Sequence, residues 1–110
     1  MSFQASEILH KGLKRFWTSG GKDLSGISPS WANVVRAILV HLNSANSLDD
    51  IRGGLGLLKN VKHLSGHASR YSIEVNANWR ITFDCPDAKN GAVYNIDLED
   101  LHRPGGAKRR

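Results

Sequence analysis

The stretch Tyr71–Phe83, YSIEVNANWRITF, lies in the second half of the chain and decides the predicted fold. Apolar side chains occupy every second position on both sides of its central Asn-Ala-Asn, at Tyr71, Ile73, Val75, Trp79, Ile81 and Phe83. Because successive side chains of a strand point to opposite faces, this pattern predicts two strands joined by a turn, with one face buried. The intervening residues predict a polar opposite face, formed by Ser72, Glu74, Asn76, Arg80 and Thr82. We take that polar face as the candidate working surface.

Length and charge narrow the class of protein. The 110 residues are expected to form a single domain, residues 1–110, that ends in a flexible basic tail at about 103–110. A net charge of +5 and a pI near 9.7 favour an anionic partner, such as nucleic acid or an acidic protein. The one cysteine, Cys85, cannot form an internal disulfide, which fits a reducing cytoplasm. No apolar run reaches the roughly 18 residues of a transmembrane helix, and the N-terminal MSFQASEIL lacks the pattern of a secretory signal.

Helical periodicity predicts two helices before the central stretch. Apolar residues recur at i, i+3 and i+4 within residues 10–18, and again between Pro29 and Leu42. Ser28 is expected to cap the second helix, with Pro29 at its first position. Residues 48–51 predict a further helical turn.

Alternation elsewhere predicts additional strands at residues 57–64 and 92–98, and the Pro, Asn and Gly residues between 84 and 91 predict a turn. Together these elements predict an α+β fold. In it, two N-terminal helices pack on a four- to five-stranded, mostly antiparallel sheet.

The sequence contains no recognisable metal or cofactor motif. His63 and His67 are four residues apart, but in a strand-and-turn region this spacing does not place them on one face. The GGLG segment at 53–56 lacks the Lys-Ser/Thr that follows a phosphate-binding loop. We therefore expect neither a metal nor a cofactor.

A set of residues suited to metal-independent RNA cleavage remains: Lys62, Arg80, Asp100 and His102, with Asn78 nearby. Such cleavage requires that the 2′-hydroxyl lose a proton, that the crowded phosphate be stabilised, and that the leaving 5′-oxygen be protonated. Histidine, carboxylate and lysine exchange protons, while arginine binds phosphate oxygens in a bidentate manner. Basic residues on an exposed face usually do no more than keep that surface hydrated, so these residue types alone do not establish RNA cleavage.

Several motifs resemble one known family. HKGLKRFW at 10–17, LSG at 64–66, VNANWRITF at 75–83 and NIDLEDLH at 95–102 resemble, in this order, the HigB toxins of the RelE/ParE superfamily. The resemblance covers about residues 6–102. It implies a RelE-like fold and a cytoplasmic, prokaryotic toxin of a type II toxin–antitoxin module, which cuts mRNA in the ribosomal A site through a 2′,3′-cyclic phosphate. It also implies as partners a HigA-like helix-turn-helix antitoxin, the ribosome and mRNA, operator DNA only through the antitoxin, and no membrane.

The resemblance also implies roles for individual residues. His102 is expected to act as general acid or base, Asp100 to orient it, and Arg80 to stabilise the phosphate. Lys62 lies where the family has a histidine and is expected to replace it. The residues expected to contact RNA are Asn78, Lys11, Lys14 and Arg15.

The match is incomplete at some positions, which leaves alternatives open. Leu101, Ser65 and Glu74 replace a tyrosine, a lysine and an arginine of the family pattern, and Glu74 could pair with Lys62 or Arg80 across the sheet. One alternative is a ParE-like toxin of the same fold that inhibits DNA gyrase. The other is a catalytically degenerate module that only binds the antitoxin or RNA.

Overall fold

The computed structural model describes residues 3–54, 61–76, 78–87, 89–90 and 92–100. Within these residues the elements follow one another as η1 (Ala5–Glu7), α1 (Lys11–Thr18), η2 (Pro29–Trp31), α2 (Ala32–Ser44), α3 (Leu48–Gly54), β1 (Val61–His63), β2 (Arg70–Glu74), β3 (Trp79–Asp84) and β4 (Tyr94–Asp100), where η denotes a 3-10 helix.

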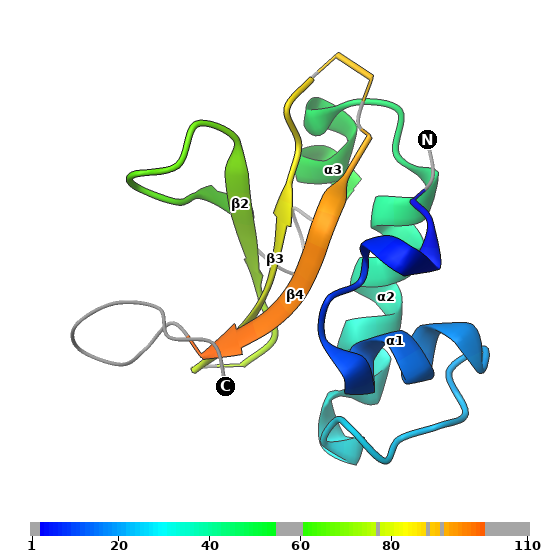
Figure 1. The fold of residues 1–110 in the computed structure, drawn as a ribbon. Helices are drawn as coiled ribbons and strands as arrows, with labels where there is room; N and C mark the ends of the chain where they lie inside the picture. The colour runs from blue at the N-terminus through cyan, green and yellow to red at the C-terminus, as the bar shows by residue number, and fades with distance from the viewer. Residues whose placement is uncertain (1–2, 55–60, 77, 88, 91, 101–110) are drawn as a thin grey trace.

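The strands form one antiparallel sheet in the order β1-β2-β3-β4, so each strand pairs with its neighbour in sequence (Figure 1). The N-terminal segment adds an isolated parallel bridge to the outer edge of β4, where the Leu9 N–H donates to the Ile96 carbonyl at 2.7 Å. The predicted α+β fold with an antiparallel sheet is confirmed. Strand β4 is displaced toward the C-terminus relative to the predicted 92–98, and residues 57–60 of the predicted strand 57–64 lie outside the described residues.

Helices α1, α2 and α3 lie on one side of the sheet (Figure 1). Their apolar side chains and those of the sheet form one core, whose largest fully buried members are Phe16, Phe83, Leu13, Ile38, Leu39, Leu42, Ile51, Ile73, Ile81, Ile96 and Val35. Trp79 is half-buried against this core, and its ring lies 5.7 Å from that of Trp31. The residues predicted for the apolar face of the central hairpin therefore do face the helices.

The start of α2 differs in one detail from the sequence prediction. Pro29 does occupy a first helical position, but it belongs to η2, and α2 begins at Ala32. The prediction that the Ser28 side chain caps the helix is wrong, because its hydroxyl makes no cap hydrogen bond and instead lies 2.9 Å from the Ser30 hydroxyl. The helical turn predicted at 48–51 is the beginning of α3.

Gly12 in α1 packs directly against Gly26 in the loop before α2. A Cβ atom added at Gly12 would lie 2.5 Å from the Cα and 2.6 Å from the carbonyl carbon of Gly26. No real Cβ approaches backbone atoms so closely, and neither backbone segment can yield as a flexible side chain would. The packing of α1 on this loop therefore requires glycine.

Substitution Gly12→Ala is expected to lower the free energy of unfolding by about 1–3 kcal/mol, the usual cost of overpacking. The gain in helix propensity, about 1 kcal/mol, opposes this loss. Urea denaturation checks the prediction, with Lys11→Ala as control because Lys11 is exposed on the same helix. Equal stability of Gly12→Ala and the wild-type protein would contradict the close packing.

The side chain of His10 caps α1, since its Nδ1 accepts a hydrogen bond from the Leu13 N–H at 3.0 Å. Burial lowers the pKa of His10 below its ordinary value; the nearby Asp97 raises it and Arg15 lowers it further. Protonation would also convert the accepting nitrogen into a donor and remove the cap. The folded state therefore favours the neutral imidazole.

The free energy of unfolding is expected to fall as the pH drops below about 6.5, because the unfolded chain then binds the His10 proton more readily than the folded protein. His10→Asn keeps a side-chain acceptor for the Leu13 N–H but does not titrate. Urea denaturation at pH 7.5 and 5.5 should show a smaller pH dependence for His10→Asn than for the wild-type protein. An unchanged pH dependence would show that His10 does not cause it.

Candidate functional site

The strand register places polar side chains of neighbouring strands side by side on the face of the sheet that points away from the helices. One row across the sheet consists of Lys62, Ser72, Thr82 and Asp97, and the next row consists of Glu74, Arg80 and Glu99. We call this the polar face. Directly opposite residues of an antiparallel pair point to the same side, so the register alone fixes which side chains share it.

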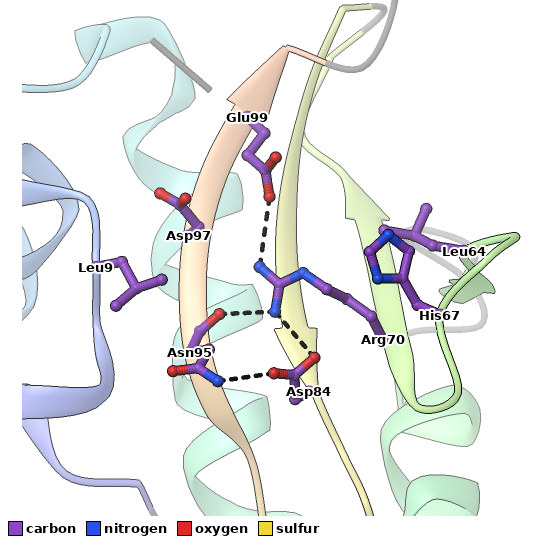
Figure 2. A pocket seen from close by; sticks show the side chains of 8 residues that line it. All are labelled: Leu9, Leu64, His67, Arg70, Asp84, Asn95, Asp97 and Glu99. Carbon is purple, nitrogen blue, oxygen red and sulfur yellow. Dashed lines mark hydrogen bonds and ion pairs between the residues drawn. The ribbon is translucent and has the colours of Figure 1, made fainter. Parts of the chain in front are cut away.

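Arg70, the first residue of β2, lies at one end of the polar face, and its side chain reaches across β3 toward β4 (Figure 2). Its Nη1 lies 3.1 Å from Asp84 Oδ1 and donates to the Asn95 carbonyl at 3.0 Å. Its Nη2 donates to the Thr82 hydroxyl at 2.8 Å and lies 3.4 Å from Glu99 Oε2. Arg70 thereby connects β2 with both β3 and β4.

A pocket of about 400 Å³ opens beside this network; its lining residues are Leu9, Leu64, His67, Arg70, Asp84, Asn95, Asp97 and Glu99 (Figure 2). Glu99 also accepts a short hydrogen bond from the Thr82 hydroxyl, and Asn95 Nδ2 donates to Asp84 Oδ2 at 2.8 Å. Three carboxylates and one guanidinium therefore surround the pocket.

Arg70 was not among the predicted site residues, although one signal in the sequence points to it. Arg70 precedes Ser72 by two residues and therefore shares the strand parity of the predicted polar face. The polar face was also predicted to be more exposed than it is, because Ser72 and Thr82 are only 1% and 0% exposed. Arg70 and Glu99 both bind the Thr82 hydroxyl, so a residue expected on the working surface lies beneath a charged network.

The predicted catalytic residues do not all lie on one face. Lys62, which is exposed on β1, and Arg80, which is half-buried on β3, share the polar face. Asp100 pairs with Trp79 and therefore lies on the opposite, helix-facing side at the end of β4. His102 lies outside the described residues.

Arg80 lies between two carboxylates, because Glu74 is opposite it on β2 and Glu99 is opposite it on β4. It forms an ion pair with neither of them. The salt bridge considered between Glu74 and Lys62 or Arg80 is likewise not formed. The guanidinium of Arg80 therefore has no carboxylate partner in the described part of the chain.

Of the residues predicted to contact RNA, Asn78 is exposed in the β2–β3 turn, while Lys11, Lys14 and Arg15 are exposed on α1. The turn is held by Asn76, whose Oδ1 accepts hydrogen bonds from the Asn78 and Trp79 N–H groups, each at 2.9 Å.

The three cations of α1 differ in their surroundings. Arg15 Nε donates to the Ser25 hydroxyl at 3.4 Å and lies 3.9 Å from Asp23 Oδ2, so it helps to hold the following loop. Lys11 and Lys14 make no side-chain hydrogen bond or ion pair with other described residues. Among the described residues, no three His, Cys, Asp or Glu side chains are grouped so as to hold a metal ion.

A four-stranded antiparallel sheet with helices on one side and a polar face on the other fits a RelE-like fold. The family model described as "RelE-like toxin of type II toxin-antitoxin system HigB" matches residues 6–102, and the chain therefore belongs to this HigB-like family. Over 93 residues the chain is 30% identical to a protein of Proteus vulgaris named "Endoribonuclease HigB", covering 84% of this chain and 94% of the relative. The resemblance inferred from the motifs is confirmed.

Membership of a type II toxin family implies that an antitoxin is a partner of this protein. In the described part of the chain, no helix has both the length and the apolar character that crossing a bilayer requires.

The Thr82 hydroxyl is expected to stabilise the network between Arg70 and Glu99. Thr82→Val keeps the shape of the side chain but leaves both charged partners short of one hydrogen bond, so we expect a loss of about 1–3 kcal/mol in the free energy of unfolding. Thr82→Ser keeps the hydroxyl and is expected to lose less. Thermal and urea denaturation of the two variants compare them directly, and equal stabilities would show that the hydroxyl contributes little.

Proposed function

We propose that this protein is a ribosome-dependent mRNA endonuclease that inhibits translation, cutting its substrate without a metal through a 2′,3′-cyclic phosphate. The observation that supports this most directly is the position of Arg80. Its guanidinium lies on the polar face of the sheet, half-buried and without a carboxylate partner among the described residues. Such a group can bind a phosphate through two parallel hydrogen bonds. The family and the name of the Proteus vulgaris relative support the same class of reaction.

In the proposed reaction, the 2′-oxygen attacks the adjacent phosphorus and the bond from phosphorus to the 5′-oxygen breaks. A base takes the 2′-hydroxyl proton, an acid gives a proton to the leaving oxygen, and Arg80 stabilises the charge on the phosphate. His102 is the proposed acid or base. Lys62, on the same face as Arg80, is the proposed second proton-transfer or charge-stabilising group.

The place of Asp100 in the sheet limits the role that can be proposed for it. As the last residue of β4, it precedes His102 by two positions, but its register partner is Trp79 on the helix-facing side. Its proposed role is therefore to orient the imidazole of His102 rather than to contact the phosphate. A carboxylate that fixes the tautomer and direction of a catalytic histidine is a recurring arrangement.

In the proposed mechanism, the ribosome positions the mRNA for cleavage. Holding the reacting groups in place can remove several kcal/mol from a barrier, so a modest set of catalytic residues is sufficient in a complex that already positions mRNA. Asn78, Lys11 and Lys14 are exposed and are the proposed contacts to RNA. Arg15 is proposed as a weaker contact, because Asp23 and Ser25 already lie near its guanidinium.

The proposed partners are a HigA-like helix-turn-helix antitoxin, the ribosome and mRNA, with operator DNA reached only through the antitoxin. The proposed location is the cytoplasm of a prokaryote. An antitoxin is implied by the family, and the net charge of +5 suits both an acidic protein and RNA.

Purified protein added to a translating extract is expected to cut mRNA only when ribosomes are present. Arg80→Ala should reduce the rate of cleavage about 10²-fold or more, by analogy with the loss of other charge-stabilising donors, and His102→Ala should reduce it by about 10²–10⁴-fold. Lys89→Ala is the control, because Lys89 is exposed in the loop after β3. Mapping of mRNA 5′ ends measures the cuts.

Intact mRNA in this assay would contradict the proposal, and blocked DNA gyrase in the same extract would indicate the ParE-like alternative. Intact mRNA with neither translation nor gyrase inhibited would indicate a module that only binds.

A further inference from the structure

The strand register predicts an ion pair that does not form. Arg80 on β3 and Glu99 on β4 are directly opposite one another on the polar face. Opposite charges in such positions have Cβ atoms about 5 Å apart and usually attract. Yet the carboxylate of Glu99 is bound elsewhere, by Arg70 Nη2 at 3.4 Å and by the Thr82 hydroxyl. Glu99 is therefore turned along β4, away from its opposite neighbour.

The hold on Glu99 is strong because its partners are themselves fixed and shielded from water. The side chains of Arg70 and Glu99 are only 14% and 12% exposed. Nη1 of Arg70 is bound to Asp84 and to the Asn95 carbonyl, and Asp84 is bound in turn by the Asn95 side chain. Charge-assisted hydrogen bonds in such a shielded network are stronger than those on an open surface.

We propose that Arg70 is a positioning residue that holds the Glu99 carboxylate away from Arg80 and so keeps the Arg80 guanidinium available for an RNA phosphate. This inference rests on the proposed function, in which Arg80 binds the phosphate. Arg70 itself contacts no RNA in this scheme, because its guanidinium is already bound by two carboxylates, a carbonyl and a hydroxyl. It acts only through Glu99.

Among the described residues, removal of the Arg70 charge would leave Glu99 with the Thr82 hydroxyl as its one remaining partner. The cation that lies opposite Glu99 on the neighbouring strand, Arg80, would then be free to attract it. In Arg70→Met, Glu99 is expected to rotate toward Arg80 and form the ion pair that the wild-type register lacks. An RNA phosphate would then have to compete with Glu99 for the guanidinium.

Two measurements test the inference separately from the proposed function. The first is a crystal structure of Arg70→Met without RNA, in which an Arg80–Glu99 ion pair is expected. Glu99 remaining away from Arg80 in that structure would overturn the inference, whatever the activity of the protein. The second is the binding of a short, fluorescently labelled single-stranded RNA at several KCl concentrations.

Affinity for RNA falls as salt rises, and each phosphate contact of a single strand adds about 0.7 to the steepness of the plot of log affinity against log salt concentration. If Arg80 makes one such contact, Arg80→Ala should make this slope shallower by about 0.7. Arg70→Met should reduce the slope by a similar amount. The double variant Arg70→Met/Glu99→Gln should restore it, because the neutral amide no longer competes for the guanidinium.

Arg70→Met/Asp84→Asn is the matched control. Like Arg70→Met/Glu99→Gln, it returns the polar face to its wild-type net charge, but it leaves the Glu99 carboxylate able to pair with Arg80. Its salt dependence should therefore remain as shallow as that of Arg70→Met. Equal rescue by both double variants would overturn the inference in favour of a simple effect of net charge. Rescue by neither would show that Arg70 contacts RNA itself or only maintains the fold.

Failure of the proposed function would look different. If Arg80→Ala leaves RNA binding unchanged while the Arg70→Met crystal structure shows the Arg80–Glu99 pair, then Arg70 does position Glu99, and the role assigned to Arg80 is wrong. Thermal denaturation of both double variants accompanies the binding measurements, because both lack Arg70. Similar stability of the two would show that a difference in RNA binding does not come from a difference in folding.

Discussion

The register between β2 and β3 is the constraint on which the rest of the structure depends. It places Ile73 opposite Ile81 in the core and, on the other side of the sheet, Arg70 opposite Asp84. A shift of one residue would turn each of these side chains to the wrong face. Apolar burial on one side and an ion pair on the other therefore select the same register. The side chain of Asn76 reinforces it from the turn, by accepting hydrogen bonds from two backbone N–H groups.

The helices contribute to the site indirectly, by fixing one side of the sheet. Leu13, Phe16 and Ile38 pack against the sheet in a single core, so polar residues of the strands can gather only on the other side. The N-terminal segment also connects the two sides. Leu9 hydrogen-bonds to the edge of β4 and lines the pocket beside Arg70, and the next residue, His10, caps α1.

The two arginines of the polar side of the sheet have different surroundings. Arg70 is surrounded by carboxylates and stabilises the sheet, whereas Arg80, between two carboxylates in the register, is paired with neither. The same residue type thus has a structural role at one position and is the proposed phosphate-binding group at another. Since the protein belongs to a family of RelE-like toxins, this division separates the residues that hold the sheet together from those proposed to act on RNA.

The sequence by itself determined the fold class and the family. Strict alternation in Tyr71–Phe83 and helical spacing around Leu13 and Ile38 are local patterns, and local patterns specify which face of each element is buried. The four quoted motifs were sufficient to identify the family. Strand parity also assigned Arg80 to the polar face, whereas only the β1–β2 register places Lys62 on that face.

Only the tertiary structure decided how the polar groups pair. Parity placed Thr82 on an exposed surface, but a network joining three strands buries it. Asp100 was grouped with Arg80, but the β3–β4 register places it on the opposite face, beside Trp79. Arg70 and Glu99 are 29 residues apart in sequence and on strands that are not adjacent. No local pattern encodes such a contact, because it depends on how far two long side chains reach across a third strand once the sheet has formed.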